Sequence, residues 1–144
     1  MWFFFLPFIL QSIVIPIDEF CFHWRRGLPR WERIGHPLDT CTIILCFVFT
    51  LLFPYSRKML LFFAPLALFS AFFVTKDEFV HKECCGAKEQ WLHAILFLNH
   101  PLMLISAGFL WARGFIPFLA IQTALTTAFC IYQLIYWNVL WKPK

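Results

Sequence analysis

Five long apolar stretches, separated by short charged segments, decide what this chain of 144 residues is able to fold into. Each is close to the ~20 residues that a helix needs to cross a hydrocarbon core about 30 Å thick. Backbone groups in lipid must be hydrogen-bonded within their own segment, so such stretches form helices. They run from Met1 to Ile17, Pro37 to Tyr55, Met59 to Thr75, Trp91 to Trp111 and Phe115 to Trp141. The sequence predicts an all-α fold, a polytopic transmembrane bundle of five helices.

The composition excludes other classes of protein. Hydrophobic residues make up 61% of the chain and charged residues 14%, against about a quarter charged in soluble domains. This balance excludes an ordinary soluble domain and a disordered segment, and it makes the lipid bilayer the expected partner. The net charge of +4 is too small and too dispersed to indicate a nucleic-acid partner. A homo-oligomer is compatible with the sequence.

The first and third apolar stretches are short, which leaves two possibilities: little tilt, or helices that continue into the polar residues that follow. If every stretch spans, the two long polar connections and the C-terminus share one side. That side carries nine basic residues, Arg25, Arg26, Arg30, Arg33, Lys76, Lys82, Lys88, Lys142 and Lys144. The other side carries Arg57, Lys58 and Arg113. The positive-inside rule predicts cytoplasmic connections and an N-terminus outside.

All eight acidic residues and all five histidines lie in two windows, Asp18 to Asp39 and Asp77 to His100. Both windows open with Asp-Glu-Phe at the end of an apolar stretch, and both reach a glycine nine residues later. This order predicts one transmembrane domain built from two parallel two-helix repeats, residues 1–55 and 59–112, plus an extra helix at 115–141. Parallel repeats of this kind are known from transporters.

Beyond the glycine, two alignments of the windows are open. One matches the Glu32/His36 pair to Glu89/His93 and preserves the four-residue interval. The other matches the two His-Pro-Leu strings, which begin at His36 and His100. Both hold if the second half has an extra histidine.

The two windows hold residues typical of a metal site. Residues four apart share a helix face, so three pairs each offer an oxygen and a nitrogen to one point: Glu19 with His23, Asp77 with His81, and Glu89 with His93. Carboxylates at a membrane boundary persist when paired, hydrated or bound to a cation, and carboxylate plus imidazole suits Fe, Mn or Zn. The candidate ligands are Glu19, His23, Glu32, His36, Asp77, Glu78, His81, Glu89, His93 and His100. A second tier comprises Asp18, Asp39 and Asn99.

Each weaker candidate has a plainer interpretation. Asp18 and Asp77 suit salt bridges to Arg25 or Lys82. Asp39 suits a helix start, and Asn99 suits a contact between helices. The basic cluster of Arg25, Arg26, Arg30 and Arg33 suits anionic headgroups, although plain charge bias also explains it.

The order Glu19, Glu32 with His36, Glu78, Glu89 with His93 resembles ferritin-like di-metal carboxylate four-helix bundles. That resemblance implies one Glu from each of two helices and a Glu/His pair from each of the other two. The chain departs from the family in its four-residue Glu-to-His interval and in its membrane-type core. Pro37 leaves open whether Glu32 and His36 lie on one continuous helix.

We therefore expect an integral membrane metalloprotein with one or two divalent ions, Fe slightly favoured over Zn. The first hypothesis is an enzyme acting on a lipid-soluble or quinone-like substrate, an oxidoreductase with Fe or a hydrolase with Zn. The alternatives are a divalent-metal carrier or sensor, and a membrane partner subunit without catalysis.

Overall fold

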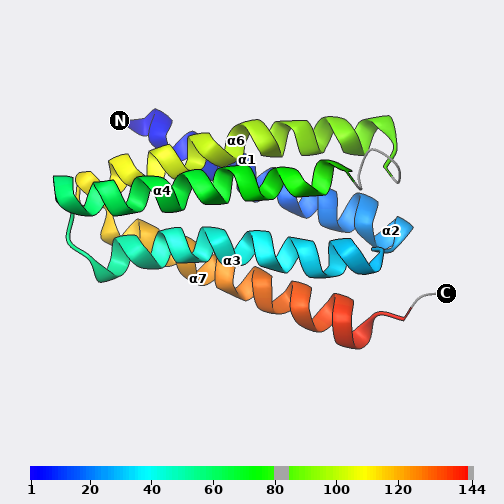
Figure 1. The fold of residues 1–144 in the computed structure, drawn as a ribbon. Helices are drawn as coiled ribbons and strands as arrows, with labels where there is room; N and C mark the ends of the chain where they lie inside the picture. Colours follow the sequence, from blue (N-terminus) through cyan, green and yellow to red (C-terminus); the bar gives the residue numbers. More distant parts are fainter. Residues whose placement is uncertain (80–84, 143–144) are drawn as a thin grey trace.

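The computed structural model describes residues 1–79 and 85–142, and for Asp77 the backbone only. All regular structure in this part of the chain is helical (Figure 1). Five helices are long and apolar enough to cross a membrane: Trp2–Arg26, Arg30–Leu52, Arg57–Lys76, Ala87–Ala112 and Ile116–Leu140. The predicted fold class is confirmed.

The first long helix joins η1 (Trp2–Phe5), α1 (Leu6–Ile17), the π-helical η2 (Asp18–His23) and α2 (Trp24–Arg26). The remaining elements are α3 (Arg30–Leu52), α4 (Arg57–Phe73), η3 (Val74–Asp77), α6 (Ala87–Ala112), α7 (Ile116–Ile135) and η4 (Tyr136–Leu140). The two short apolar stretches thus belong to helices that continue into the polar residues after them. Asp18, Glu19 and His23 of the first window therefore lie on the same long helix as the first apolar stretch.

The second helix begins at Arg30 and not at Pro37, where the apolar stretch begins, and it runs through the proline without a break. A proline inside a helix leaves the carbonyl four residues earlier without its usual N–H donor. Here that carbonyl belongs to Arg33, and the side-chain amide of Asn138 donates to it at 3.3 Å. Glu32 and His36 therefore lie on one continuous helix.

In the bundle, α3 packs along α7 and against α4, while α1 packs along α6 (Figure 1). The apolar core lies between these helices and includes Phe8, Phe47 and Leu104. Trp111 closes the core towards the α3–α4 turn, and its indole N–H donates to the carbonyl of Phe53 at 2.9 Å. The turn between α2 and α3, the start of α6 and the end of η4 lie together at the opposite end of the bundle, as the sequence predicts (Figure 1).

The first helix of each predicted half packs against the second helix of the other half, α1 on α6 and α4 on α3. A two-fold exchange of the halves requires this pairing. However, α4 also packs against α6, whereas α3 is covered by α7 instead of α1. The internal repeat stays a prediction from the sequence.

Candidate metal centre

The π-helical segment η2 decides which side chains of the first window meet. Its backbone hydrogen bonds reach back five residues, so side chains four and five apart both lie on one side of the helix. His23 is therefore reached by two carboxylates. Its Nδ1 lies 3.2 Å from Glu19 Oε2, and its Nε2 lies 3.3 Å from Asp18 Oδ2.

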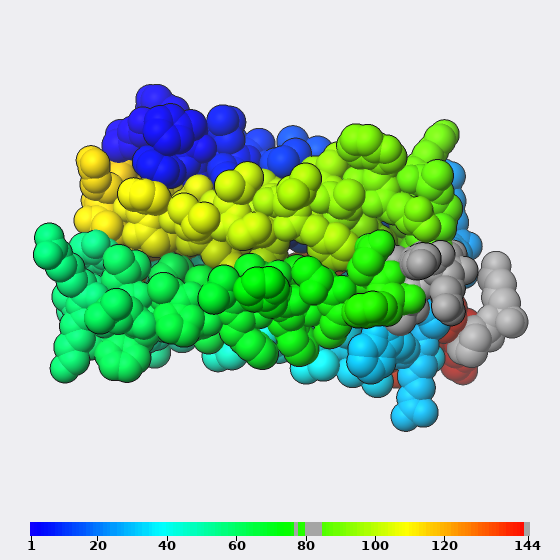
Figure 2. Space-filling model, turned by 45° about the horizontal axis from the view of Figure 1, so that its top comes forward, coloured from blue at the N-terminus to red at the C-terminus, as the bar shows by residue number. Residues whose placement is uncertain are grey.

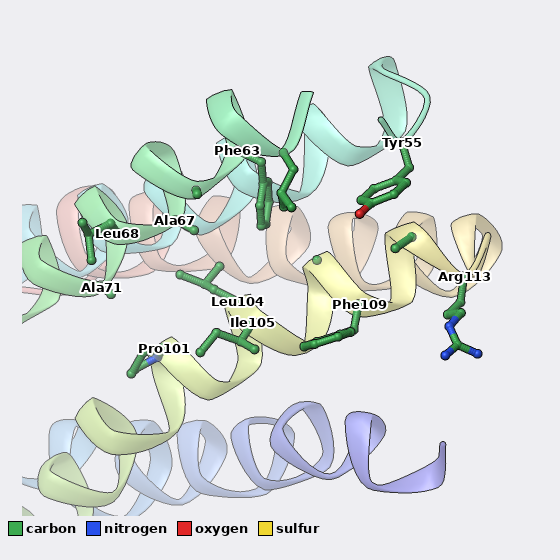
Figure 3. A pocket seen from close by; sticks show the side chains of 14 residues that line it. Tyr55, Phe63, Ala67, Leu68, Ala71, Pro101, Leu104, Ile105, Phe109 and Arg113 are labelled. Atoms are coloured by element: carbon green, nitrogen blue, oxygen red, sulfur yellow. The ribbon is translucent and has the colours of Figure 1, made fainter. Parts of the chain in front are cut away.

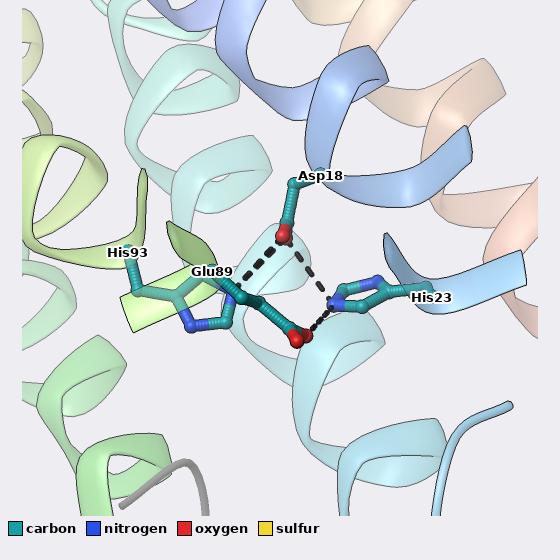
Figure 4. A group of neighbouring side chains, drawn as sticks. All are labelled: Asp18, His23, Glu89 and His93. Atoms are coloured by element: carbon teal, nitrogen blue, oxygen red, sulfur yellow. Dashed lines mark hydrogen bonds and ion pairs between the residues drawn. The ribbon is translucent and has the colours of Figure 1, made fainter. Parts of the chain in front are cut away.

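The start of α6 supplies the facing pair, Glu89 and His93 (Figure 4). His93 Nε2 lies 3.1 Å from each carboxylate oxygen of Asp18. Glu89 Oε1 lies 3.8 Å from His23 Nε2. All four side chains are buried, and one ligand atom from each lies within 4.8 Å of the others. Two donors each about 2.1 Å from a common ion stand roughly 3.0–3.8 Å apart, so the spacing suits a metal ion.

A second group shares His23 with the first. It consists of His23, Glu32 and His36, again with one ligand atom of each within 4.8 Å of the others. The rings of His23 and His36 stack with centroids 5.0 Å apart. Because Glu32 and His36 are one turn apart on α3, this group brings the second helix into the same polar end. Figure 4 shows the ribbons of these helices around the first group.

Glu19 belongs to neither group and instead orients His23. Its Oε1 accepts hydrogen bonds from the Tyr132 hydroxyl and the Trp137 indole, both at 2.7 Å. Its Oε2 faces His23 Nδ1. Histidines that bind metals usually donate their second ring N–H to a carboxylate in this way, which leaves the other nitrogen free to ligate. The arrangement directs His23 Nε2 towards Asp18 and Glu89.

Arg26 is part of this site. Its guanidinium donates to Glu32 at 2.8 Å and to Glu89 at 2.9 Å. Arg33 donates to the carbonyl of Trp137 at 3.5 Å, and its guanidinium lies 5.3 Å from the centre of the Trp141 ring. The other two members of the predicted basic cluster, Arg25 and Arg30, are exposed.

Several predicted ligands lie elsewhere. His100 Nε2 lies 3.0 Å from the Ser70 hydroxyl. Asp39 is bound by Lys76 at 2.6 Å. Asn99 donates to the carbonyl of Pro7 and to the Gln11 side chain, so it connects α6 to α1.

The second Asp-Glu-Phe segment contributes no described side chain to either group. Glu78 is exposed. The side chain of Asp77 and the whole of His81 lie outside the described residues. The pairing of Asp77 with His81 therefore stays a prediction.

A cavity of about 90 Å³ lies directly behind the first group, towards the middle of the bundle. Its polar lining is Gln11, Asp18, Glu19, His23, His36, Asp39, Thr40, His93, His100 and Gln133. Liquid water takes about 30 Å³ per molecule, so this space has room for a small number of waters or a small ligand beside an ion.

Oxygen and nitrogen atoms make up both groups, without sulfur. Cys85 precedes α6 and is half-buried. Burial is the main cause that raises the pKa of its thiol to about 12. The thiol is therefore protonated at neutral pH.

Sequence reasoning underrated Asp18 and missed Tyr132 and Trp137. Asp18 stands five residues before His23, an interval that an α-helix does not place on one face, and only the π-helical turn makes it a neighbour. Tyr132 and Trp137 lie far along the chain and look like ordinary interfacial aromatics. No pattern in the sequence connects them to Glu19.

No protein family, curated protein or solved structure was found to match this chain.

Proposed function

We propose that this protein is an integral membrane metalloprotein whose ion is held by Asp18, His23, Glu89 and His93. One observation carries the proposal: four buried side chains from two separate helices bring their ligand atoms within 4.8 Å of one another. Burial of such groups is unfavourable unless a cation or hydrogen bonds compensate for the lost hydration.

The charge balance of the site supports a cation. Four buried carboxylates, those of Asp18, Glu19, Glu32 and Glu89, meet at the polar end of the bundle. Arg26 pairs with two of them, Glu32 at 2.8 Å and Glu89 at 2.9 Å. A bound cation would offset the negative charge that gathers here. Nε2 of His23 makes no hydrogen bond in the described part of the chain while facing two carboxylates, a position suited to a cation.

The ligand atoms of the site indicate which metals it suits and how many ions it could hold. Imidazole and carboxylate together suit Fe, Mn or Zn, and we propose Fe ahead of Zn. The group of His23, Glu32 and His36 offers a second position that shares one histidine with the first. One ion, or two neighbouring ions, fit this arrangement.

A groove beside the site supports a lipid-soluble substrate. It has a volume of about 290 Å³ and is lined mostly by apolar residues of α1, α3 and α7, among them Phe8, Phe47 and Leu125. Gln11 and Thr40 line both this groove and the polar cavity. A substrate in the bilayer would therefore approach the centre through the groove. We propose oxidation or hydroxylation if the ion is Fe, and metal-assisted hydrolysis if it is Zn.

The distribution of basic residues supports an orientation of the bundle in the membrane. The polar end carries most of the basic residues, which places it on the cytoplasmic side by the positive-inside rule. A ferrous site facing the reducing cytoplasm is chemically consistent with this orientation.

A divalent-metal carrier is the second candidate, because polar groups reach deeper than the membrane boundary. His100 lies near the midpoint of α6 and lines the cavity behind the first group. Ionisable groups at mid-membrane typically mark ion pathways. Metal uptake into proteoliposomes would favour this candidate over the enzyme.

The metal content of detergent-purified protein tests the proposal. Wild type is expected to hold at least one ion per chain, and Asp18→Asn and His93→Gln are expected to lose it. Two matched controls, His100→Gln and Glu78→Gln, are expected to keep it, because the first alters a buried histidine outside both groups and the second an exposed glutamate. Metal-free wild type, or full occupancy in Asp18→Asn and His93→Gln, would overturn the proposal. Elemental analysis by inductively coupled plasma mass spectrometry would identify the ion as iron or zinc.

A further inference from the structure

A second groove lies between α4 and α6, away from the metal centre (Figure 3). Its volume is about 500 Å³, and its walls are apolar, with small residues such as Ala64, Ala67 and Gly108 along its length. In the space-filling view, the side chains of α4 and α6 run side by side on one face, and the groove follows the seam between them (Figure 2).

The length of this groove matches one leaflet of a bilayer. On α4 it extends from Leu60 to Ala71, and on α6 from Pro101 to Arg113. At 1.5 Å per residue each wall is about 16–18 Å long, roughly half of a 30 Å hydrocarbon core. The inner end of the groove therefore lies near mid-membrane. There Ser70 is hydrogen-bonded to His100, which lines the polar cavity.

The outer end of the groove is positively charged. Tyr55 and Arg113 both line the groove at this end, with the Arg113 guanidinium pointing away from Tyr55 (Figure 3). Arg57 and Lys58 begin α4 at the same end. All eight acidic residues of the chain belong to the windows Asp18 to Asp39 and Asp77 to His100, and none of those that the structure describes lines this groove. Among the described residues no carboxylate pairs with Arg113, so its charge is available to an anion.

We infer that this groove binds one acyl chain of an anionic phospholipid, whose phosphate contacts Arg113. The groove is as long as one leaflet of the hydrocarbon core, its walls are apolar, and Arg113 lies where a lipid headgroup would be. The lipid would also support α4, the helix with the smallest share of its membrane-type window buried in the bundle, 11%. Filling the groove restores packing that the protein itself does not supply.

The test compares dioleoyl phosphatidylglycerol with dioleoyl phosphatidylcholine, added to detergent-purified protein, by thermal unfolding and by native mass spectrometry. The anionic lipid is expected to raise the Tm by roughly 5–10 °C at a hundredfold excess over its Kd. Arg113→Gln is expected to weaken its binding roughly tenfold or more. Ala64→Trp, which fills the groove from an exposed position, is expected to abolish the bound lipid counted by mass spectrometry.

Two variants control for general charge and bulk. Arg57→Gln removes a cation from the same end without altering the groove lining, and Leu61→Trp enlarges an exposed residue of α4 outside the groove. Both are expected to bind the anionic lipid as wild type does. Equal binding of the two lipids, or an equal loss in Arg57→Gln and Arg113→Gln, would overturn the inference. Metal content does not enter this test, so its result is independent of the proposed metal centre.

Discussion

Replacing Glu19 by Gln tests whether the Glu19 carboxylate keeps the ring proton of His23 on Nδ1 and so leaves Nε2 free to bind a metal. Gln keeps the shape of the side chain and one oxygen, so it is still able to accept from Tyr132 and Trp137. The second oxygen becomes an NH₂ group, which donates and does not accept. His23 Nδ1 must then become the acceptor, and the ring proton moves to Nε2, the nitrogen that faces Asp18 and Glu89. A protonated Nε2 does not bind a metal ion.

The expected loss of metal affinity is roughly 10- to 100-fold, the usual effect of removing a carboxylate that orients a ligating histidine. In free energy this is about 1.4–2.7 kcal/mol. A competition titration with a chromophoric chelator, on metal-free protein in detergent, measures the affinity directly. Tyr132→Phe is the matched control, because it removes one donor to Glu19 but leaves the carboxylate and its contact with His23 intact. Its affinity is expected to fall by less than threefold.

An unchanged affinity in Glu19→Gln would refute this reasoning while leaving the metal centre itself in place. An equal loss in Glu19→Gln and Tyr132→Phe would show that the effect is structural and does not depend on the ring proton. The unfolding temperature of each metal-free variant must be measured alongside, since general destabilisation lowers apparent affinity through the unfolded population.

Three further substitutions have expected effects on stability, each measurable as thermal or chemical unfolding in detergent. Arg26→Gln removes the cation that bridges two buried carboxylates and should destabilise the metal-free protein by about 3 kcal/mol. Added metal should recover part of this loss. An unchanged Tm would contradict the ion-pair assignment. Gly27→Ala should destabilise the protein by roughly 1–3 kcal/mol, because Gly27 has φ +77° and an added Cβ would lie 2.7 Å from a ring carbon of Trp141. Adding Trp141→Ala should relieve the clash with the ring but not the backbone strain. Asn99→Ala breaks two hydrogen bonds between α6 and the first helix and should cost about 1–2 kcal/mol, whereas a neutral result would mean that packing alone holds these helices together.

The sequence was sufficient for the fold class because membrane insertion leaves few choices. Apolar stretches of about spanning length have to be helical in lipid, and five were predicted and found. The start of α3 was misplaced because hydropathy marks where lipid contact begins and not where a helix begins. Continuity through Pro37 depends on Asn138, a residue that lies about 100 positions away and gives no local signal.

The metal centre, like the fold, was only partly predictable from the sequence. The pair Glu89 and His93 follows from helical periodicity, whereas Pro37 left the pair Glu32 and His36 open; the structure brings both pairs to the polar end. Asp18 depends on a π-helical turn, which no short pattern predicts. Glu19 looked like a ligand because it is four residues from His23, yet its hydrogen bonds to Tyr132 and Trp137 fix it behind that histidine. Periodicity therefore predicted which residues are neighbours, but not which atoms they turn towards each other.

The proposed centre connects charge balance to helix packing. Its four donors come in equal number from η2, at the end of the first helix, and from the start of α6, and α1 and α6 pack along each other below them. A metal ion at this point would neutralise carboxylates and also hold the two helices together. Binding free energy of a metal at a site shared between elements adds directly to the stability of their packing. Ion occupancy would then be coupled to docking of the first helix on α6, and removal of the ion would loosen the wall of the cavity behind it.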